Sequence, residues 1–252
     1  MENNNKKSGI TLYLIIITII TAICIIVGVF GRTFHVKGKN RFGNVFTKAG
    51  SEVTEEVKTE DFDTVNIELD MGEIVLEEGD NYFVSYAFPE KIKPIIHVNN
   101  GALTITQTDG KVLNLEDFSD CKLVVTVPAG TELNSIDIST DMGNIDVNKI
   151  SAQSATVSSD MGEIEFQECD FVALSADSDM GDIKMEDSAI TSADMESSMG
   201  EVKMVAVTCD NLTVSVDMGD IKLEGEFKHV NAKTDLGEIK ENGASQGTEY
   251  HK

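Results

Sequence analysis

A recurring D-M-G-x-I motif places carboxylates at a regular interval in the second half of the chain. Its copies begin at positions 141, 160, 179, 198, 217 and 235, so the interval is constant except before the last copy, and Ser198 replaces Asp in one of them. If each copy occupies the same place in successive turns of a repetitive fold, the carboxylates form a column, and oxygen ligands so arranged suit calcium. The candidate ligands are Asp141, Asp160, Asp179, Asp217 and Asp235.

The same aspartates also have a structural explanation. An Asp at the start of a tight turn can accept hydrogen bonds from backbone N–H groups two or three residues on, and Ser does so more weakly. Two unit charges about 4.8 Å apart in water repel by only roughly 0.9 kcal/mol, which exposed corners tolerate without a metal. The motif also lacks the Gly-Gly-x-Gly-x-Asp spacing of calcium-binding β-rolls. We therefore expect turn residues rather than a metal site, and no cofactor.

The glycine of the motif is expected to set the corner, because only Gly adopts a positive φ cheaply. The methionine before it, as in Met161 and Met180, is expected to be tucked beneath the corner. An earlier copy begins at Asp70, several repeat lengths before Asp141, so the intervening segment holds either divergent coils or inserted strands. The expected corner glycines are Gly72, Gly143, Gly162, Gly181, Gly200, Gly219 and Gly237.

No set of residues fits an enzyme. A β-helix that cleaves acidic polysaccharides needs a base and positive charge around its anionic substrate, yet no Arg follows Arg41 in the sequence. The serine pairs at 158–159 and 197–198 have neither a basic partner nor a nucleophile elbow. The histidines follow no motif: they are His35, His97, His229 and His251. We expect a non-catalytic protein.

The cysteines form no CxxC pair, and three of the four follow the apolar N-terminal run. An odd number in the soluble part argues against a disulfide framework. We expect Cys121, Cys169 and Cys209 to be small buried apolar residues.

Apolar residues keep their places within each repeat unit. In one unit they form three alternating pairs, Ile145 with Val147, Ile150 with Ala152, and Ala155 with Val157. Alternation at i and i+2 is typical of short strands with one buried face. The sequence therefore predicts an all-β, single-stranded parallel β-solenoid (β-helix) of about 19-residue coils, each stacked on the next at roughly 4.8 Å.

The run at 9–31, GITLYLIIITIITAICIIVGVFG, carries no charge and is long enough for one transmembrane α-helix preceding the solenoid. A cleavable signal peptide would have a shorter apolar stretch followed by small residues, and a lipoprotein would have a small residue rather than Ile23 before Cys24. We expect six parts: a tail at 1–8, the transmembrane helix at 9–31, a flexible stalk at 32–52, N-terminal β coils and a cap at 53–140, the regular solenoid at 141–240 and a polar tail at 241–252.

The formal net charge of −24 is unevenly distributed. Beyond Arg41 there are 14 basic and 43 acidic residues, a net charge of −29. This excludes nucleic acid as a partner, since its affinity depends on basic side chains that displace counterions.

The apolar run, the stretch VTVPAGTELNSIDIST at 125–140 and the D-M-G-x-I units resemble the bacterial putative-adhesin family over roughly residues 52–240. The resemblance implies a membrane-anchored β-solenoid at the cell surface, sometimes linked to envelope-stress signalling, and supplies no catalytic residues. The positive-inside rule, counted literally, favours a cytoplasmic domain, whereas the family points outward.

The expectation is a single-pass cell-membrane protein with an extracellular soluble domain that binds a protein or surface glycan as an adhesion module. The alternative is an accessory protein of an envelope-stress system that binds a membrane partner. Calcium-binding surface protein ranks third.

Overall fold

The computed structural model describes residues 52–108, 121–245 and 248–251. The tail, transmembrane helix and nearly all of the stalk expected at 1–52 lie outside these residues. Within them the fold is all-β, with one short 3₁₀ turn, η1 (Glu90–Ile92). That turn is far too short to cross a bilayer, and no other helix in the described ranges could do so.

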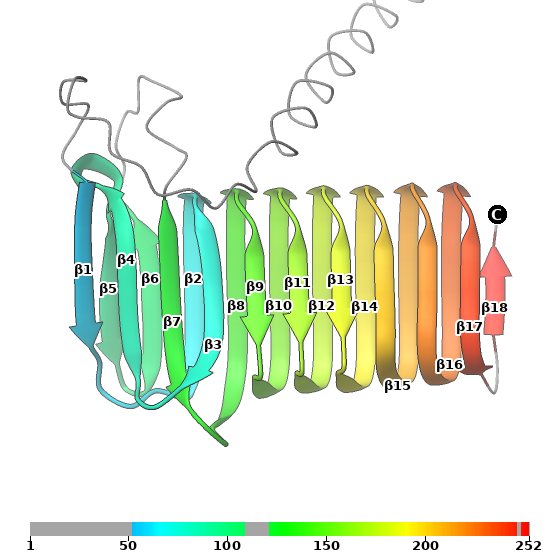
Figure 1. Ribbon diagram of the computed structural model, residues 1–252, viewed down its shortest axis with the longest axis horizontal. Helices are drawn as coiled ribbons and strands as arrows, with labels where there is room; N and C mark the ends of the chain where they lie inside the picture. Colours follow the sequence, from blue (N-terminus) through cyan, green and yellow to red (C-terminus); the bar gives the residue numbers. More distant parts are fainter. Residues whose placement is uncertain (1–51, 109–120, 246–247, 252) are drawn as a thin grey trace, which may run out of the picture. The chain divides into compact units, whose positions relative to one another are not determined.

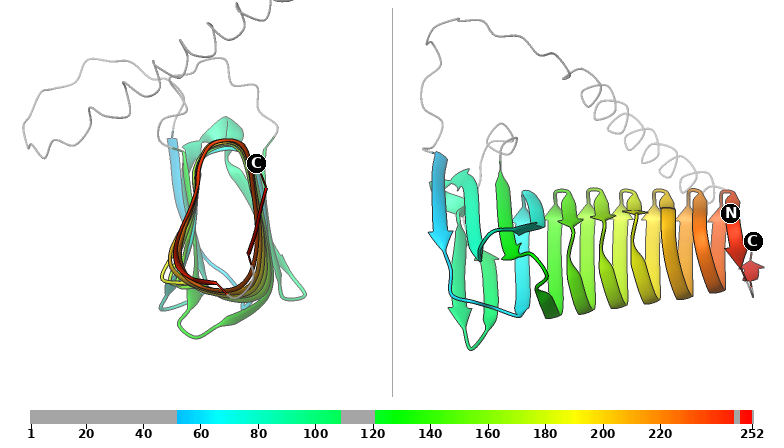
Figure 2. Two further views of the ribbon diagram at one scale, coloured as in Figure 1. Left: turned by 90° about the vertical axis from the view of Figure 1, so that its right-hand side faces the viewer. Right: turned by 60° about the horizontal axis from the view of Figure 1, so that its bottom comes forward.

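Strands in the second half wind into the expected solenoid (Figure 1). Each coil has a long strand that ends at the D-M-G corner and a short strand that follows it. Seen along the stack, the coils superpose as a closed oval with two long sides (Figure 2). The strands are β8 (Glu132–Met142), β9 (Ile145–Asn148), β10 (Ser151–Met161), β11 (Ile164–Gln167), β12 (Asp170–Met180), β13 (Ile183–Glu186), β14 (Ala189–Met199), β15 (Val202–Met218), β16 (Ile221–Leu236), β17 (Ile239–Ser245) and β18 (Thr248–His251).

The coils stack in parallel and in register with the sequence repeat. Met161 pairs with Met142 on one side and with Met180 on the other, so each coil advances the chain by one repeat. Met218 pairs with Leu236, which reproduces the shorter interval before the last motif copy. The predicted coil length is therefore confirmed.

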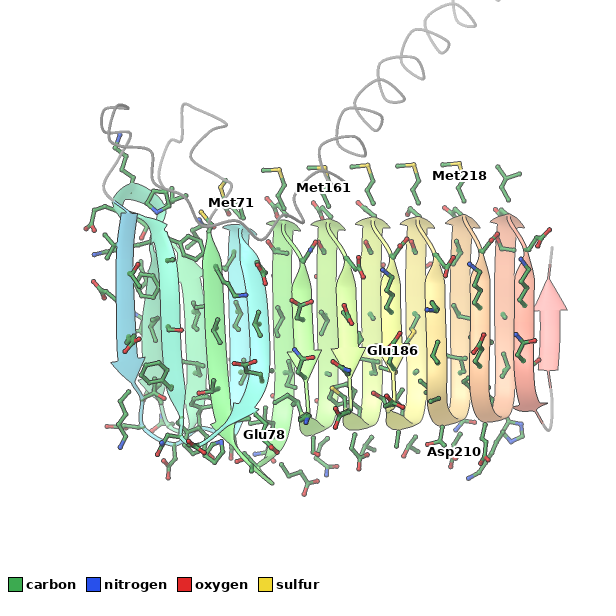
Figure 3. The ribbon with its side chains drawn as sticks, viewed as in Figure 1. Met71, Glu78, Met161, Glu186, Asp210 and Met218 are labelled. Atoms are coloured by element: carbon green, nitrogen blue, oxygen red, sulfur yellow. The ribbon has the colours of Figure 1, made fainter. Side chains whose placement is uncertain are left out.

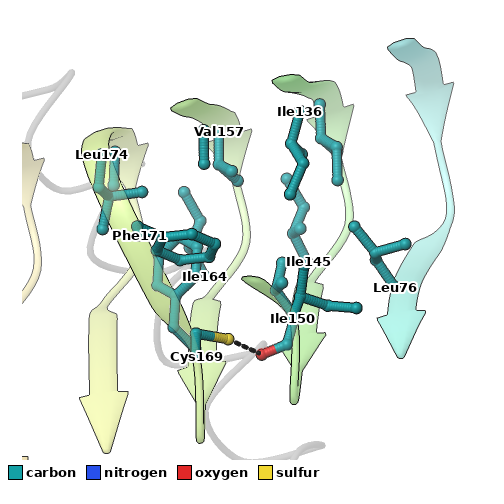
Figure 4. Close-up of a cluster of buried hydrophobic side chains, with 14 of the residues drawn as sticks. Leu76, Ile136, Ile145, Ile150, Val157, Ile164, Cys169, Phe171 and Leu174 are labelled. Carbon is teal, nitrogen blue, oxygen red and sulfur yellow. Dashed lines mark hydrogen bonds between the residues drawn. The ribbon is translucent and has the colours of Figure 1, made fainter. Parts of the chain in front are cut away.

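The core is a column of inward-facing side chains, one set from each coil. Figure 4 shows part of it, with Ile145, Ile164 and Phe171 stacked between neighbouring coils. All three predicted alternating pairs are buried. Burying one such Ile or Phe stabilises the fold by about 1.5 to 3 kcal/mol, and the contacts come from adjacent coils, so no coil is stable alone.

The segment between Asp70 and Asp141 is an insertion of extra strands. The first D-M-G coil stacks directly on the next one, because Met71 pairs with Met142 and Ile74 with Ile145. The strands of this end are β1 (Glu52–Lys58), β2 (Thr64–Met71), β3 (Glu73–Gly79), β4 (Phe83–Pro89), β5 (Pro94–Asn99), β6 (Ala102–Gln107) and β7 (Lys122–Pro128).

These extra strands extend the stack at its N-terminal end. Strands β6 and β7 add in parallel to β2 and β3, and then β5 and β4 pair antiparallel with them. Strand β1 completes the edge against β4. At the opposite end, β17 and β18 pair in parallel with β16. Residues 241–245 and 248–251, which belong to the polar tail expected at 241–252, are strands.

The corner glycines are needed mainly because adjacent coils lie very close together at this corner, and only secondarily because of their φ angles. A Cβ on Gly162 would lie 1.9 Å from the carbonyl oxygen of Gly143, and one on Gly181 would lie 1.9 Å from that of Gly162. The φ of Gly162 is 157°, a positive value that residues with a side chain rarely adopt. The expectation that a positive φ selects glycine at this corner is thus incomplete, since adjacent coils lie too close for any side chain.

A different corner carries the left-handed residues. They recur once per coil where the short strand segment ends, and none is glycine: Lys149, Glu168, Asp187 and Ala206 have φ between 50° and 57°. Sequence reasoning missed this corner because it carries no glycine.

We expect opposite effects from exchanging Gly and Ala at the two corners. Gly162→Ala should lower the free energy of unfolding by about 3 kcal/mol or more, because its Cβ overlaps backbone that cannot move alone. Ala206→Gly removes left-handed strain of about 1 kcal/mol, partly offset by the greater freedom of unfolded glycine, and should leave stability equal or higher. Urea denaturation of both variants measures this. A larger loss for Ala206→Gly would contradict the steric explanation.

Candidate functional site

The five candidate aspartates lie on different coils along a single edge of the solenoid. Four precede paired methionines, and Asp235 precedes Leu236, which pairs with Met218. All five are exposed. In the described part of the chain, no group of three or more His, Cys, Asp or Glu side chains is placed to hold a metal ion.

The turn bonds differ from those expected of the aspartates. The residue after the glycine acts instead, and it bonds to the next coil: Asn144 Oδ1 accepts from the Glu163 amide at 3.0 Å, and Asp182 Oδ1 accepts from the Glu201 amide at 2.8 Å. Nowhere in the described ranges does Asp141, Asp160 or Asp179 accept a local backbone hydrogen bond. Their side chains are left free to face solvent.

A buried hydroxyl column secures the corner, and sequence reasoning missed it. Ser159 Oγ donates to the Gly143 carbonyl at 3.1 Å, and Thr234 Oγ1 donates to the Gly219 carbonyl at 3.0 Å. Ser178 and Ser197 make the same contact. The available signal was the hydroxyl residue that recurs directly before the Asp position.

The methionines point outward, and the expectation that they are tucked beneath the corner is wrong. Met142, Met161, Met180, Met199 and Met218 are 37–48% exposed. Figure 3 shows their side chains projecting from one edge, with Met161 and Met218 labelled. The alternation fails here because the chain turns at the glycine, so Asp and Met both leave the core.

One long side of the oval is a charged face, formed by β9, β11, β13 and the first parts of β15 and β16. Lysines there reach carboxylates of the neighbouring coil: Lys184 pairs with Glu163, and Lys222 pairs with Glu201. Lys122 pairs with Glu73 at 2.7 Å. These pairs offset part of the negative charge of the carboxylates that directly follow the corner glycines, such as Glu163 and Glu201.

The opposite long side carries short polar side chains, and we call it the short polar face. Its outward residues line up across strands in three columns. Two of them carry mostly short side chains: Asp137, Thr156, Ser175, Asp194, Thr213 and Asn231 in one, and Ser135, Ser154, Ala173, Ser192, Asn211 and His229 in the other. The third lies next to the D-M-G edge and includes Asp177, Glu196 and Lys233. A hollow at its N-terminal end is lined by Asn66, Glu68, Thr104, Thr106, Asp137 and Ser139, among others.

The remaining chemical candidates are not assembled into a site. His97 on β5 and His229 on β16 lie near opposite ends of the stack (Figure 1). The other two histidine side chains lie outside the described side chains. Ser159 and Ser197 are buried donors in the corners.

The cysteines Cys121, Cys169 and Cys209 are buried, as predicted, and the thiols of Cys169 and Cys209 are free. Burial raises the pKa of Cys169 and of Cys209 to about 11. At neutral pH these thiols are therefore protonated and unreactive.

Carboxylates crowd one another at the edge of the short polar face. Burial raises the pKa of Asp177, and the charges of Glu196, Asp179 and Asp160 raise it further. The charged form of Asp177 is thus disfavoured in the folded state.

Asp177→Asn should raise the melting temperature at pH 7. A folded-state pKa above the unfolded value contributes stability at low pH that is lost as the pH rises through it, so the gain should vanish below about pH 4. Asp210→Asn is the control: it removes the same charge but breaks an ion pair with Lys228 at 2.6 Å. Thermal unfolding between pH 3 and 8 measures both. An equal gain in both variants would contradict local crowding.

Comparison with known proteins identifies a family with which this chain shares its sequence pattern. The sequence model of the Toastrack DUF4097 family matches residues 62–242. No curated protein matches the chain.

Several solved structures are similar at low identity. A putative adhesin from Bacteroides fragilis NCTC 9343 is 15% identical with a TM-score of 0.43, over 80% of this chain and 97% of that one. A putative lipid binding protein from Parabacteroides distasonis ATCC 8503 is 18% identical with a TM-score of 0.40, over 81% and 98%. A putative cell adhesion protein from Clostridium sporogenes ATCC 15579 is 13% identical with a TM-score of 0.40, over 78% and 100%.

The family match spans the extra strands and the repeated coils alike, and it confirms the resemblance inferred from the motifs. The chain belongs to the Toastrack DUF4097 family.

Proposed function

We propose that this protein is a non-catalytic binding module, anchored in the cell membrane by residues 9–31, whose solenoid is presented outside the cell. The apolar run supports the anchor. The family to which the chain belongs supports the outward orientation of the solenoid, because the resemblance to it implies a location at the cell surface.

The short polar face carries this proposal. Stacking repeats the same outward positions on every coil, so Thr156, Ser175 and Thr213 form one line of hydrogen-bonding groups on a rigid surface. Short side chains lose little rotamer entropy when they are immobilised, unlike Lys or Glu. A rigid scaffold also reduces the ordering cost of association. Such a face suits an extended partner that offers hydroxyl or amide groups, which a surface glycan or a protein backbone provides.

The charged face is a weaker candidate. Its lysines and glutamates are long, partly exposed and already paired with each other, as in Lys184 with Glu163. A partner would have to break those ion pairs, and the new pairs it formed at an exposed surface would contribute little binding energy in return. The net charge also disfavours anionic partners on either face.

Intact cells that present the full chain should adhere to a surface coated with a desialylated mucin-type glycoprotein, whose glycans are largely uncharged. Ser175→Lys, which places a long side chain in the middle of the short polar face, should reduce adhesion at least severalfold. Gln167→Lys adds the same charge on the exposed charged face and should leave adhesion unchanged. Protease added to the intact cells should remove the acidic domain and abolish adhesion.

Two outcomes would overturn parts of the proposal. Equal adhesion by the two variants would show that the short polar face is not the binding surface. Protection of the acidic domain until lysis would show that it faces the cytoplasm, and partner capture that needs only residues 9–31 would favour the envelope-stress alternative.

A further inference from the structure

A ladder of methionines runs along the D-M-G edge, independently of the short polar face. Strand pairing places one methionine at the same position on each of six adjacent coils, in the order Met71, Met142, Met161, Met180, Met199 and Met218. Figure 3 shows that the labelled members, Met71, Met161 and Met218, lie along one edge. Met71 is partly buried and packs against the core, whereas Met161 and Met218 are exposed. We call the five most exposed members, Met142 to Met218, the methionine ladder.

Packing does not account for this ladder. The protein also contains methionines that fill the core: Met185 and Met204 have no exposed surface, and Met195 is 1% exposed. The ladder positions, in contrast, face solvent on a highly acidic domain. A continuous line of large apolar side chains at such a surface marks an interaction site.

The thioether group defines which ligand fits. Sulfur ligands of this soft type select Cu(I), whereas calcium and magnesium take oxygen ligands. Adjacent strands are about 4.8 Å apart. A metal–sulfur bond of about 2.3 Å, the value for zinc and thiolate, places two sulfurs about 4.6 Å apart across one ion. Methionines of neighbouring coils can therefore hold one ion between them without rearrangement of the backbone.

The surrounding charge favours a cation. Asp141, Asp160 and Asp179 precede ladder methionines and, within the described residues, form no ion pair. Lys233 neutralises Asp235 at 2.8 Å, but it does so beside Leu236, where the ladder ends. Unpaired carboxylates next to neutral sulfurs raise the local concentration of cations.

We propose that the methionine ladder binds soft monovalent cations, Cu(I) or Ag(I), each held between thioether sulfurs of adjacent coils. Five sulfurs in a line provide two such bridged pairs at a time. No redox step is involved, because the ion binds in the oxidation state in which it arrives.

Silver nitrate titration of the full chain in detergent, labelled with ¹³C at the methionine methyl groups, tests this directly. Methyl signals are the readout because cysteines also bind silver. The ladder signals should shift and saturate near two bridged ions per chain, while those of Met185 and Met204 stay in place. Calcium chloride at the same concentration should move none of them.

A triple variant, Met161→Leu with Met180→Leu and Met199→Leu, should weaken silver binding at the Met218 methyl at least tenfold, because neither coil next to Met218 then carries a methionine at this position. Leucine already occupies the equivalent position at Leu236, so the fold should be retained, and thermal unfolding checks this. Met185→Leu is the matched control in the core and should titrate like the wild type. Ladder methyl signals that do not move in excess silver, or that move equally in the triple variant, would overturn the proposal.

Discussion

Backbone hydrogen bonds between coils fix how closely the coils stack, and the rest of the structure follows from that distance. The bonds continue through the corner, where the Gly162 amide donates to the Met180 carbonyl at 3.1 Å. At this separation a Cβ on Gly162 would lie 1.9 Å from the carbonyl oxygen of Gly143. The coils can therefore stack at this corner only if the residue is glycine. The buried hydroxyl of Ser159 donates a hydrogen bond to the Gly143 carbonyl.

The sequence predicts the coil well where a physical period operates. Alternation identifies Ile164 and Phe166 as core residues, and the sequence repeat predicts the register between β10 and β12. Prediction fails where the chain turns, because alternation does not continue through a corner, and so it places Met161 on the wrong side. Ala206 shows a second limit: its left-handed backbone comes from the path of the coil and leaves no mark in its residue type.

The candidate surfaces were less predictable than the fold for a related reason. Aspartates recur in the sequence, but only stacking shows that Asp160 has no local backbone bond while Glu163 is paired with Lys184 from the next coil. Because equivalent positions are aligned, each outward position becomes a column with one chemical character. Short polar groups, ion pairs and thioethers thus occupy separate surfaces of the same coils.

Deletion of one complete coil tests this account most directly. Removing residues 162–180 joins Met161 to Gly181 and deletes one whole repeat, so every column stays in register. Coils contact only their neighbours, and the shortened chain should therefore unfold cooperatively with a modestly lower melting temperature. Removing residues 162–181 also deletes the corner glycine of the rejoined coil and should abolish cooperative folding. Equal thermal unfolding of the two deletions would contradict the account.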